Sequence, residues 1–303
     1  MIYIVQTALQ LGCIYSFVAL ALFLSYRVLD IADLTTDGCF VLGMAVSVSF
    51  CANGHPFVGV LMGMVSGALA GLVTATLQTR LGVPSILAGI VTNTGLYTVN
   101  LMAMGWSSNV SLLKNDTIFS LFKQTGIGGS WNTIILAACL AIVAMIFMKW
   151  FLSTRLGLSI RATGDNRDMV SASSINPKFT ITIGLVVANM FTGLSGALAG
   201  QLQKSADINA GTGIVTIGLA TLIIGETLIN GKKSIGRNIV ACLIGNIVYR
   251  CIYAFVLQTH IIPVEGLKLM TAFVVALAIA APHIKDNMIV MNRARRESTN
   301  VKN

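Results

Sequence analysis

Long apolar stretches alternate with short polar ones along almost the whole chain. The apolar stretches are continuous runs of Leu, Ile, Val, Ala and Gly, without the two-residue alternation that a membrane β-barrel requires. No charged residue occurs before Arg27 or between Asp37 and Arg80. Because a helix needs about 20 apolar residues to cross a bilayer, the pattern predicts helices at residues 2–25, 36–52, 57–79, 84–104, 132–152, 178–202, 208–229, 237–257 and 266–283. We therefore expect an all-α, polytopic membrane protein with about 8–10 transmembrane helices, in which residues 1–303 form a single transmembrane domain.

Composition supports this prediction, since 55% of the residues are hydrophobic and only 10% are charged. Such a chain is too apolar for an ordinary water-soluble domain. The net charge of +9 comes from Lys and Arg residues that flank the apolar runs, so nucleic acid is not an expected partner. The positive-inside rule requires most basic residues to be cytoplasmic. This condition is met if the N-terminus is outside and residues 285–303 form a cytoplasmic tail. We expect this orientation in the plasma (inner) membrane of a bacterium, with lipid around the spans.

Two loops are longer than the topology needs. The external loop, residues 105–131, is polar and glycine-rich, and it suits either contact with an outside partner or a solvated hairpin. The cytoplasmic loop, residues 153–177, has a helix start at Gly164-Asp165, a short apolar side at Met169 and Val170, and a stop at Asn176-Pro177. Such a helix is too short to be stable alone. Composition fits a solvated connector and a docking element equally well.

Small residues recur at helical spacing in two places. Gly59, Gly63, Gly67 and Gly71 lie four residues apart, which indicates a face that packs closely on another helix, with a flexible gate as the alternative. The hexapeptide Ser-Gly-Ala-Leu-Ala-Gly occurs at residues 66–71 and again at residues 195–200. The first copy lies on a helix predicted to run inward and the second on one predicted to run outward. This relationship predicts an internal inverted repeat, which is common in transporters.

The sequence offers little for catalysis, metal binding or cofactor binding. The six cysteines form no CxxC pair, and the three histidines fall at predicted helix ends or turns. The segment from Gly225 to Ser234 resembles a phosphate-binding loop, but five residues separate its glycines and Lys233 stands where Ser or Thr should follow the lysine. We therefore predict that the chain is not an enzyme and holds no metal, cofactor or ATP site.

Polar residues inside the predicted spans are the candidates for a translocation path, because burying them in a bilayer is costly. These candidates are Asp37, Asn93, Asn189, Asn246 and Arg250. Each has a structural alternative. Asp37 can stabilise the positive end of its own helix, the asparagines can bond between helices, and Arg250 can pair with Asp207 or Glu265. Glu226 lies near a predicted cytoplasmic helix end and can contact Lys232 or Lys233.

Three stretches resemble the permease subunits of ATP-binding-cassette importers of the branched-chain amino acid and ribose type. The first covers residues 12–43 and includes Gly12, Tyr15 and the run Asp33-Leu-Thr-Thr-Asp37-Gly38. The second covers residues 157–176. The third covers residues 193–236 and includes the second hexapeptide and Gly225. The three stretches occur in the same order as in members of this family, and together they span almost the whole chain.

The resemblance implies specific partners. Two permease subunits, as a homodimer or heterodimer, would form the path, two cytoplasmic ATPase subunits would dock beneath them, and an external binding protein would deliver the substrate. The residues that would insert into the ATPase are Asp165, Asn166, Arg167, Asp168, Met169, Val170, Ser174, Ile175 and Asn176. ATP hydrolysis would then belong to another chain.

The resemblance also suggests the substrate. The run Asp33-Leu-Thr-Thr-Asp37-Gly38 differs from the Asn-Phe-Ala-His-Gly of branched-chain permeases and is similar to a subgroup associated with tryptophan or tyrosine. We expect a small polar solute, an amino acid of the branched-chain or aromatic type. A sugar or nucleoside permease is the alternative within the family. An ion-coupled secondary transporter is the alternative outside it, although such proteins usually need an acid in the centre of a span.

Overall fold

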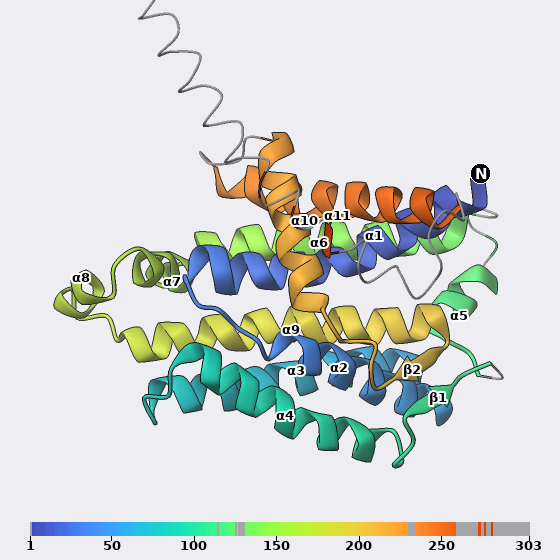
Figure 1. The fold of residues 1–303 in the computed structure, drawn as a ribbon, viewed down its shortest axis with the longest axis horizontal. Coiled ribbons are helices and arrows are strands. Elements are labelled where there is room, and N and C mark those ends of the chain that lie inside the picture. Colours follow the sequence, from blue (N-terminus) through green and yellow to red (C-terminus); the bar gives the residue numbers. More distant parts are fainter. Residues whose placement is uncertain are drawn as a thin grey trace, which may run out of the picture.

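The computed structural model describes residues 2–113, 115–124, 126, 131–229 and 234–258, together with residues 272, 273, 276 and 280. The described part is mostly helical (Figure 1). The elements follow in the order α1 (Ile2–Leu22), the π-helix η1 (Phe23–Val28), α2 (Thr36–Ala52), α3 (Pro56–Thr79), α4 (Ser85–Ala103), β1 (Asn109–Ser111), α5 (Ile118–Gln124), α6 (Asn132–Ser153), α7 (Arg155–Asp165), α8 (Arg167–Ala172), α9 (Pro177–Gln203), β2 (Ser205–Asp207), α10 (Ile214–Ile229) and α11 (Ile235–Gln258).

Six of these helical segments are long and apolar enough to cross a membrane. They are Val5–Val28, Pro56–Thr79, Ser85–Ala103, Asn132–Ser153, Pro177–Gln203 and Ile235–Val256, and the shorter helices α2 and α10 are also apolar. These eight segments match the first eight predicted spans. The ninth, predicted at 266–283, lies almost wholly outside the described residues, as does the predicted tail at 285–303. The chain is therefore a multi-pass membrane protein.

The start of α10 differs from the prediction, which extended that span back to residue 208. The helix begins only at Ile214, because Gly213 has a φ of 82° that a right-handed helix cannot include. Residues 205–207 form β2 and pair antiparallel with β1, with Asn109 opposite Asp207. This two-stranded ladder is absent from the all-α prediction.

Helix α9 lies at the centre of the bundle. It packs against α3, α2 and α1, and in Figure 1 α1, α6 and α11 lie on one side of it while α2, α3 and α4 lie on the other. Much of its length is buried, including Leu185, Asn189 and Phe191. The core of the protein is thus the set of helix contacts around α9.

Glycines make the contact between α3 and α9 close. A Cβ atom on Gly63 would lie 2.7 Å from the Cβ of Ala197, and a Cβ on Gly67 would collide with the carbonyl oxygen of Asn189. A Cβ on Gly71 would contact Leu185. Residues further along α3 therefore contact residues progressively earlier in α9, which means that the two helices are antiparallel. This confirms the predicted packing face. The two hexapeptides lie on these two helices, where small residues permit the approach.

The two long loops are at opposite ends of the bundle (Figure 1). The loop at 105–131 contains β1 and α5, and the segment at 153–177 contains α7 and α8. The sequence placed a helix start at Gly164-Asp165, but α7 ends at Asp165, and α8 starts afresh because Asn166 caps it. Pro177 opens α9 instead of ending α8, in keeping with the preference of proline for a first helical turn.

Candidate functional site: a polar cavity where two short helices begin

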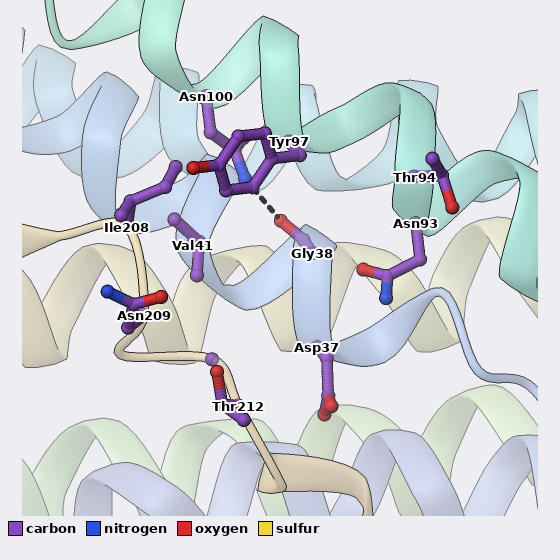
Figure 2. Close-up of a pocket in the computed structure, with 11 residues that line it drawn as sticks. Asp37, Gly38, Val41, Asn93, Thr94, Tyr97, Asn100, Ile208, Asn209 and Thr212 are labelled. Atoms are coloured by element: carbon purple, nitrogen blue, oxygen red, sulfur yellow. Dashed lines mark hydrogen bonds between the residues drawn. The ribbon is translucent and has the colours of Figure 1, made fainter. Parts of the chain in front are cut away.

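A cavity of about 370 Å³ lies between α2, α4 and the segment that precedes α10. Figure 2 shows its lining, in which amide, hydroxyl and carboxylate groups outnumber large apolar side chains. The lining residues are Asp37, Gly38, Val41, Asn93, Thr94, Tyr97, Asn100, Ile208, Asn209, Gly211 and Thr212. Two of the predicted path residues, Asp37 and Asn93, are therefore neighbours in this cavity.

The floor of the cavity is a junction between the N-termini of α2 and α10. The carboxylate of Asp37 accepts a hydrogen bond from the backbone N–H of Val215 at 2.9 Å and another from that of Gly213 at 3.1 Å. Backbone N–H groups in the first turn of a helix have no partner within the helix and carry partial positive charge. Asp37 thus lies in the first turn of its own helix, as predicted, and also caps a second helix, which was not predicted.

Helix α4 supplies the opposite wall. Asn93, Tyr97 and Asn100 lie on one face of the helix because they are four and three residues apart. The side-chain amide of Asn100 donates to the carbonyl oxygen of Gly38 at 3.1 Å (Figure 2). Asn100 thus forms the bond between helices that is expected of amides inside the spans, and it also lines the cavity. Tyr97 also lines the cavity and is 52% exposed.

A buried acid, Asp33, lies in the segment before α2 and outside the cavity lining, and the residue is only 3% exposed. It accepts a hydrogen bond of 2.6 Å from the side-chain amide of Asn189 and one of 2.9 Å from the backbone N–H of Thr35. Within the described residues no Lys, Arg or His forms an ion pair with it. Asn189, a predicted path residue, therefore does not line the cavity and instead holds Asp33. Asp33 itself entered the sequence analysis only as part of a family motif.

The other two predicted path residues lie at the contact between α1 and α11. Asn246 donates to the carbonyl oxygen of Tyr15 at 2.9 Å, and the guanidinium carbon of Arg250 lies 3.8 Å from the centre of the Tyr15 ring. The predicted ion pair with Asp207 is not among the contacts of the described residues, and Glu265 lies outside them. Asn246 and Arg250 do not line the cavity.

The segment between α6 and α9 presents a polar surface at one end of the bundle. Of the predicted coupling residues, Asp165, Asn166, Arg167, Asp168 and Met169 are exposed, whereas Val170 is the buried residue of α8. Ser174 adopts a φ of 60°, Ile175 is half-buried, and Asn176 caps α9 by accepting the N–H of Lys178 at 3.0 Å.

The same segment is fixed to the end of α1. Gly164 lies so close to Val28 that a Cβ atom would collide with the Val28 carbonyl oxygen. Beside this contact, Nε of Arg27 lies 2.9 Å from a carboxylate oxygen of Glu226 in α10. Glu226 was expected to contact Lys232 or Lys233, which lie outside the described residues. The π-helical end of α1 thus touches both α7 and α10.

The described residues hold no group of three or more His, Cys, Asp or Glu side chains that could bind a metal ion. Four of the six cysteines are buried and unpaired. The side chains around the cavity can donate and accept hydrogen bonds, and we see no nucleophile paired with a base among them. Such a site can bind and release a polar solute.

Comparisons with known proteins agree with this chemistry. The sequence model of the family described as "Branched-chain amino acid transport system / permease component" matches residues 4–281. The chain is 31% identical over 272 residues to the tyrosine transport system permease protein of Clostridioides difficile (strain R20291), covering 89% of this chain and 88% of that one. No solved structure matches significantly.

More distant relatives carry other substrate names. The chain is 29% identical over 221 residues to the D-allose transport system permease protein AlsC of Escherichia coli (strain K12), covering 71% of this chain and 64% of that one. It is 28% identical over 221 residues to the ribose import permease protein RbsC of the same strain, covering 71% and 66%. The chain belongs to the family of branched-chain amino acid and ribose-type permeases of ATP-binding-cassette transporters, whose permease component is not itself catalytic.

Proposed function

We propose that this chain forms the translocation path of an ATP-driven importer and that its substrate is an amino acid of the aromatic or branched-chain type. The observation that carries the proposal is the polar cavity that Asp37 and Asn93 line where α2 and α10 begin. The tyrosine transport permease, 31% identical over 89% of this chain, supports the substrate class. The carboxylate of Asp37 is occupied by two backbone N–H groups, so a solute in the cavity meets mainly neutral donors and acceptors.

The lengths of α2 and α10 support a path at this position. They have 17 and 16 residues, or about 25 Å at 1.5 Å per residue, which is short of the roughly 30 Å of a hydrocarbon core. Each follows an irregular segment, at residues 29–35 and 208–213. Irregular backbone at membrane depth is tolerated where it is buried in protein or lines a water-filled cavity. The cavity is lined by the second of these segments and by the start of α2, which follows the first.

The helix contacts support an inverted repeat. Helix α2 packs on both α3 and α9, and α3 packs on α9; correspondingly, α10 packs on both α11 and α1, and α11 packs on α1. The repeat would therefore pair α1, α2 and α3 with α9, α10 and α11. Each set contains a long helix, an irregular segment, a short helix and another long helix. In this arrangement α9 corresponds to α1 and α11 corresponds to α3. The two hexapeptides, on α3 and α9, therefore face each other and do not occupy corresponding positions of the two repeats.

The basic residues support an orientation with α8 in the cytoplasm. The α8 end of the bundle carries Arg80, Lys149, Arg155, Arg161, Arg167 and Lys178. The positive-inside rule therefore supports a cytoplasmic position for this end, and with it a start of α1 outside a bacterial plasma membrane. The exposed residues 165–169 would then dock on the ATPase, and the β1–β2 end would face the binding protein.

The close contact between Gly164 and Val28 supports a coupling role for α7 and α8. A displacement of this segment by the ATPase would reach the irregular segment before α2 directly. A second permease subunit, identical or different, would complete the path. Residues Asp165, Asn166, Arg167, Asp168, Met169, Val170, Ser174, Ile175 and Asn176 remain the proposed coupling set.

Reconstitution tests this function. The chain is placed in vesicles with candidate ATPase and binding-protein subunits from the same organism, and uptake of labelled tyrosine, leucine, ribose and a nucleoside is measured with and without ATP. We expect ATP-dependent uptake of an amino acid. Some relatives are named as ribose and allose permeases. If only a sugar were taken up, the proposed substrate class would be wrong, but the proposed role as a permease would stand. Uptake driven by an ion gradient without the ATPase would refute the proposed mechanism.

A further inference from the structure

A second groove, of about 520 Å³, lies at the α8 end of the bundle. It is bounded by the loop from α3 to α4 and by the segment from α8 to α9. Its lining residues are Ile31, Gln78, Thr79, Gly82, Val83, Pro84, Ser85, Arg167, Ser171, Asn176, Pro177, Lys178 and Ile181. Two of them are cationic and none is acidic. The groove therefore has an excess of positive charge.

The two cations, Arg167 and Lys178, have no ion-pair partner within the described residues. Arg167 comes from α8 and Lys178 from α9, so two separate elements bring their charges to one groove. Like charges that line the same groove repel each other, and an anion bound between them would relieve that repulsion.

Neutral donors add to this charge. Helix α4 begins at Ser85 without a side-chain cap, so the first-turn N–H groups of the helix lack side-chain acceptors. Gln78 also lines the groove, and its buried side-chain nitrogen has no acceptor in the described part of the chain, so a rotation of the side chain is needed for it to donate to a ligand there. Phosphate oxygens accept from Arg, Lys, amide and backbone N–H donors alike. The chemistry of the groove thus favours a phosphate group.

The position of the groove identifies the source of that phosphate. Helix α3 ends at the groove and α4 and α9 begin there, so it lies at the depth where spans leave the hydrocarbon core and lipid headgroups begin. Large apolar side chains beside it are exposed, with Leu81 at 71%, Ile86 at 52% and Phe179 at 53%. A phospholipid can place its headgroup in the groove and its acyl chains along these side chains. We infer that this groove binds the headgroup of an anionic phospholipid, between Arg167 and Lys178.

This site would be part of the permease alone and does not depend on the transported substrate. A bound lipid would bridge α8, in the coupling segment, to α4, which lines the path cavity. Arg167 also belongs to the proposed coupling set, so the experiment has to separate lipid from ATPase as the partner of this residue.

Native mass spectrometry of the purified full chain provides the test. The chain is titrated with phosphatidylglycerol, with phosphatidylcholine and with inorganic phosphate. We expect the first phosphatidylglycerol to bind more tightly than phosphatidylcholine, and Arg167→Gln with Lys178→Gln to weaken that binding by roughly thirtyfold, from the usual contribution of two basic residues near a membrane surface. The matched control removes two other charges of the coupling segment, Arg155→Gln with Arg161→Gln, and should leave the first lipid bound.

A variant that exchanges the two basic residues and keeps both charges controls for misfolding. Arg167→Lys with Lys178→Arg should retain the bound lipid. Equal affinity for phosphatidylglycerol in the two Gln double variants would overturn the inference. So would full competition by inorganic phosphate without any preference for lipid, since the ligand would then be a free anion. Loss of the ATPase from the Arg167→Gln/Lys178→Gln variant with unchanged lipid binding would assign the groove to that partner. None of these outcomes bears on whether the chain transports an amino acid.

Discussion

The carboxylate of Asp37 joins the first turn of α2 to the backbone N–H of Val215 in the first turn of α10. The bond connects two short helices at the floor of the polar cavity. A charged acceptor on free helix N–H groups contributes more than a neutral hydrogen bond, typically about 1.5–3 kcal/mol. Removing it should therefore affect both the stability of the protein and the shape of the proposed path.

Asp37→Ala should lower the free energy of unfolding by about 1.5–3 kcal/mol and reduce ATP-dependent uptake. Asp37→Asn should have a smaller effect, because its amide oxygen can still accept one of the two N–H groups. Thermal unfolding in detergent and vesicle uptake measure the two effects. Asp116→Asn, at an exposed carboxylate near α5, is the control. Wild-type stability and uptake in Asp37→Ala would show that the junction has neither role.

Asn189→Asp should destabilise the protein more than Asn189→Ala. The alanine variant leaves Asp33 without its side-chain donor, whereas the aspartate variant places a second carboxylate within about 3 Å of a buried one. The swapped pair Asp33→Asn with Asn189→Asp restores one acid and one amide and should recover part of the lost stability. The midpoints of thermal unfolding of the wild type, the two single variants and the swapped pair test this order of stability. A swapped pair no more stable than Asn189→Asp would mean that the pair does not act as a unit.

Gly67→Ala should lower the free energy of unfolding by about 1–3 kcal/mol, as overpacking of a close-packed core does. The added methyl group would collide with the carbonyl oxygen of Asn189 and push α3 away from α9. Gly95→Ala in α4 is a matched control, because no atom lies within 4 Å of its added Cβ. That change should be neutral or stabilising by up to about 1 kcal/mol, through helix propensity. Equal effects at the two glycines would argue against the close helix contact.

Arg27→Ala and Glu226→Ala should each cost little stability, about 1 kcal/mol or less, because the Arg27 side chain is 46% exposed. Their effects should be less than additive in a double-mutant cycle. Exchange of the two residues, Arg27→Glu with Glu226→Arg, should restore the interaction. Additive single effects would show that the ion pair does not link α1 to α10.

Combined replacement of Asp165, Arg167 and Met169 by alanine should abolish co-purification of the ATPase and ATP-dependent uptake. All three side chains are exposed and none supports the core, so the variant should insert and unfold as the wild type does. Asp207→Ala, at the opposite end of the bundle, should leave the ATPase bound. A triple variant that retained its ATPase and transported normally would refute the proposed coupling set.

Sequence predicted the spans well because the length of an apolar run is itself the physical requirement for crossing a bilayer. It also placed Asp37 correctly at a helix start. It could not show that Asp37 caps α10, because Gly213 is 176 positions away and no local pattern encodes that approach. The same holds for Arg27 and Glu226, which are 199 positions apart.

Polar residues were harder to rank than spans. Asn93, Asn189 and Asn246 are all amides inside apolar helices, yet the first lines the cavity, the second holds Asp33 and the third bonds to α1. The sequence specifies the residue type, but the rotation of each helix, set by neighbours such as the glycines of α3 and α9, decides where the amide points. Asp33 was missed as a buried acid because the irregular segment before α2 reads as a loop in the sequence.

The central place of α9 has a consequence for how the protein is made. The ribosome delivers α1 to α4 before α9 exists, since α9 begins only at Pro177, and membrane insertion follows the same order. Until then the faces of α2 and α3 that carry Gly43, Gly63 and Gly67, and the carboxylate of Asp33, lack the helix that covers them. The first third of the chain must therefore enter the membrane before these faces are covered. Nascent chains stalled before α9 should be the form most exposed to quality-control proteases.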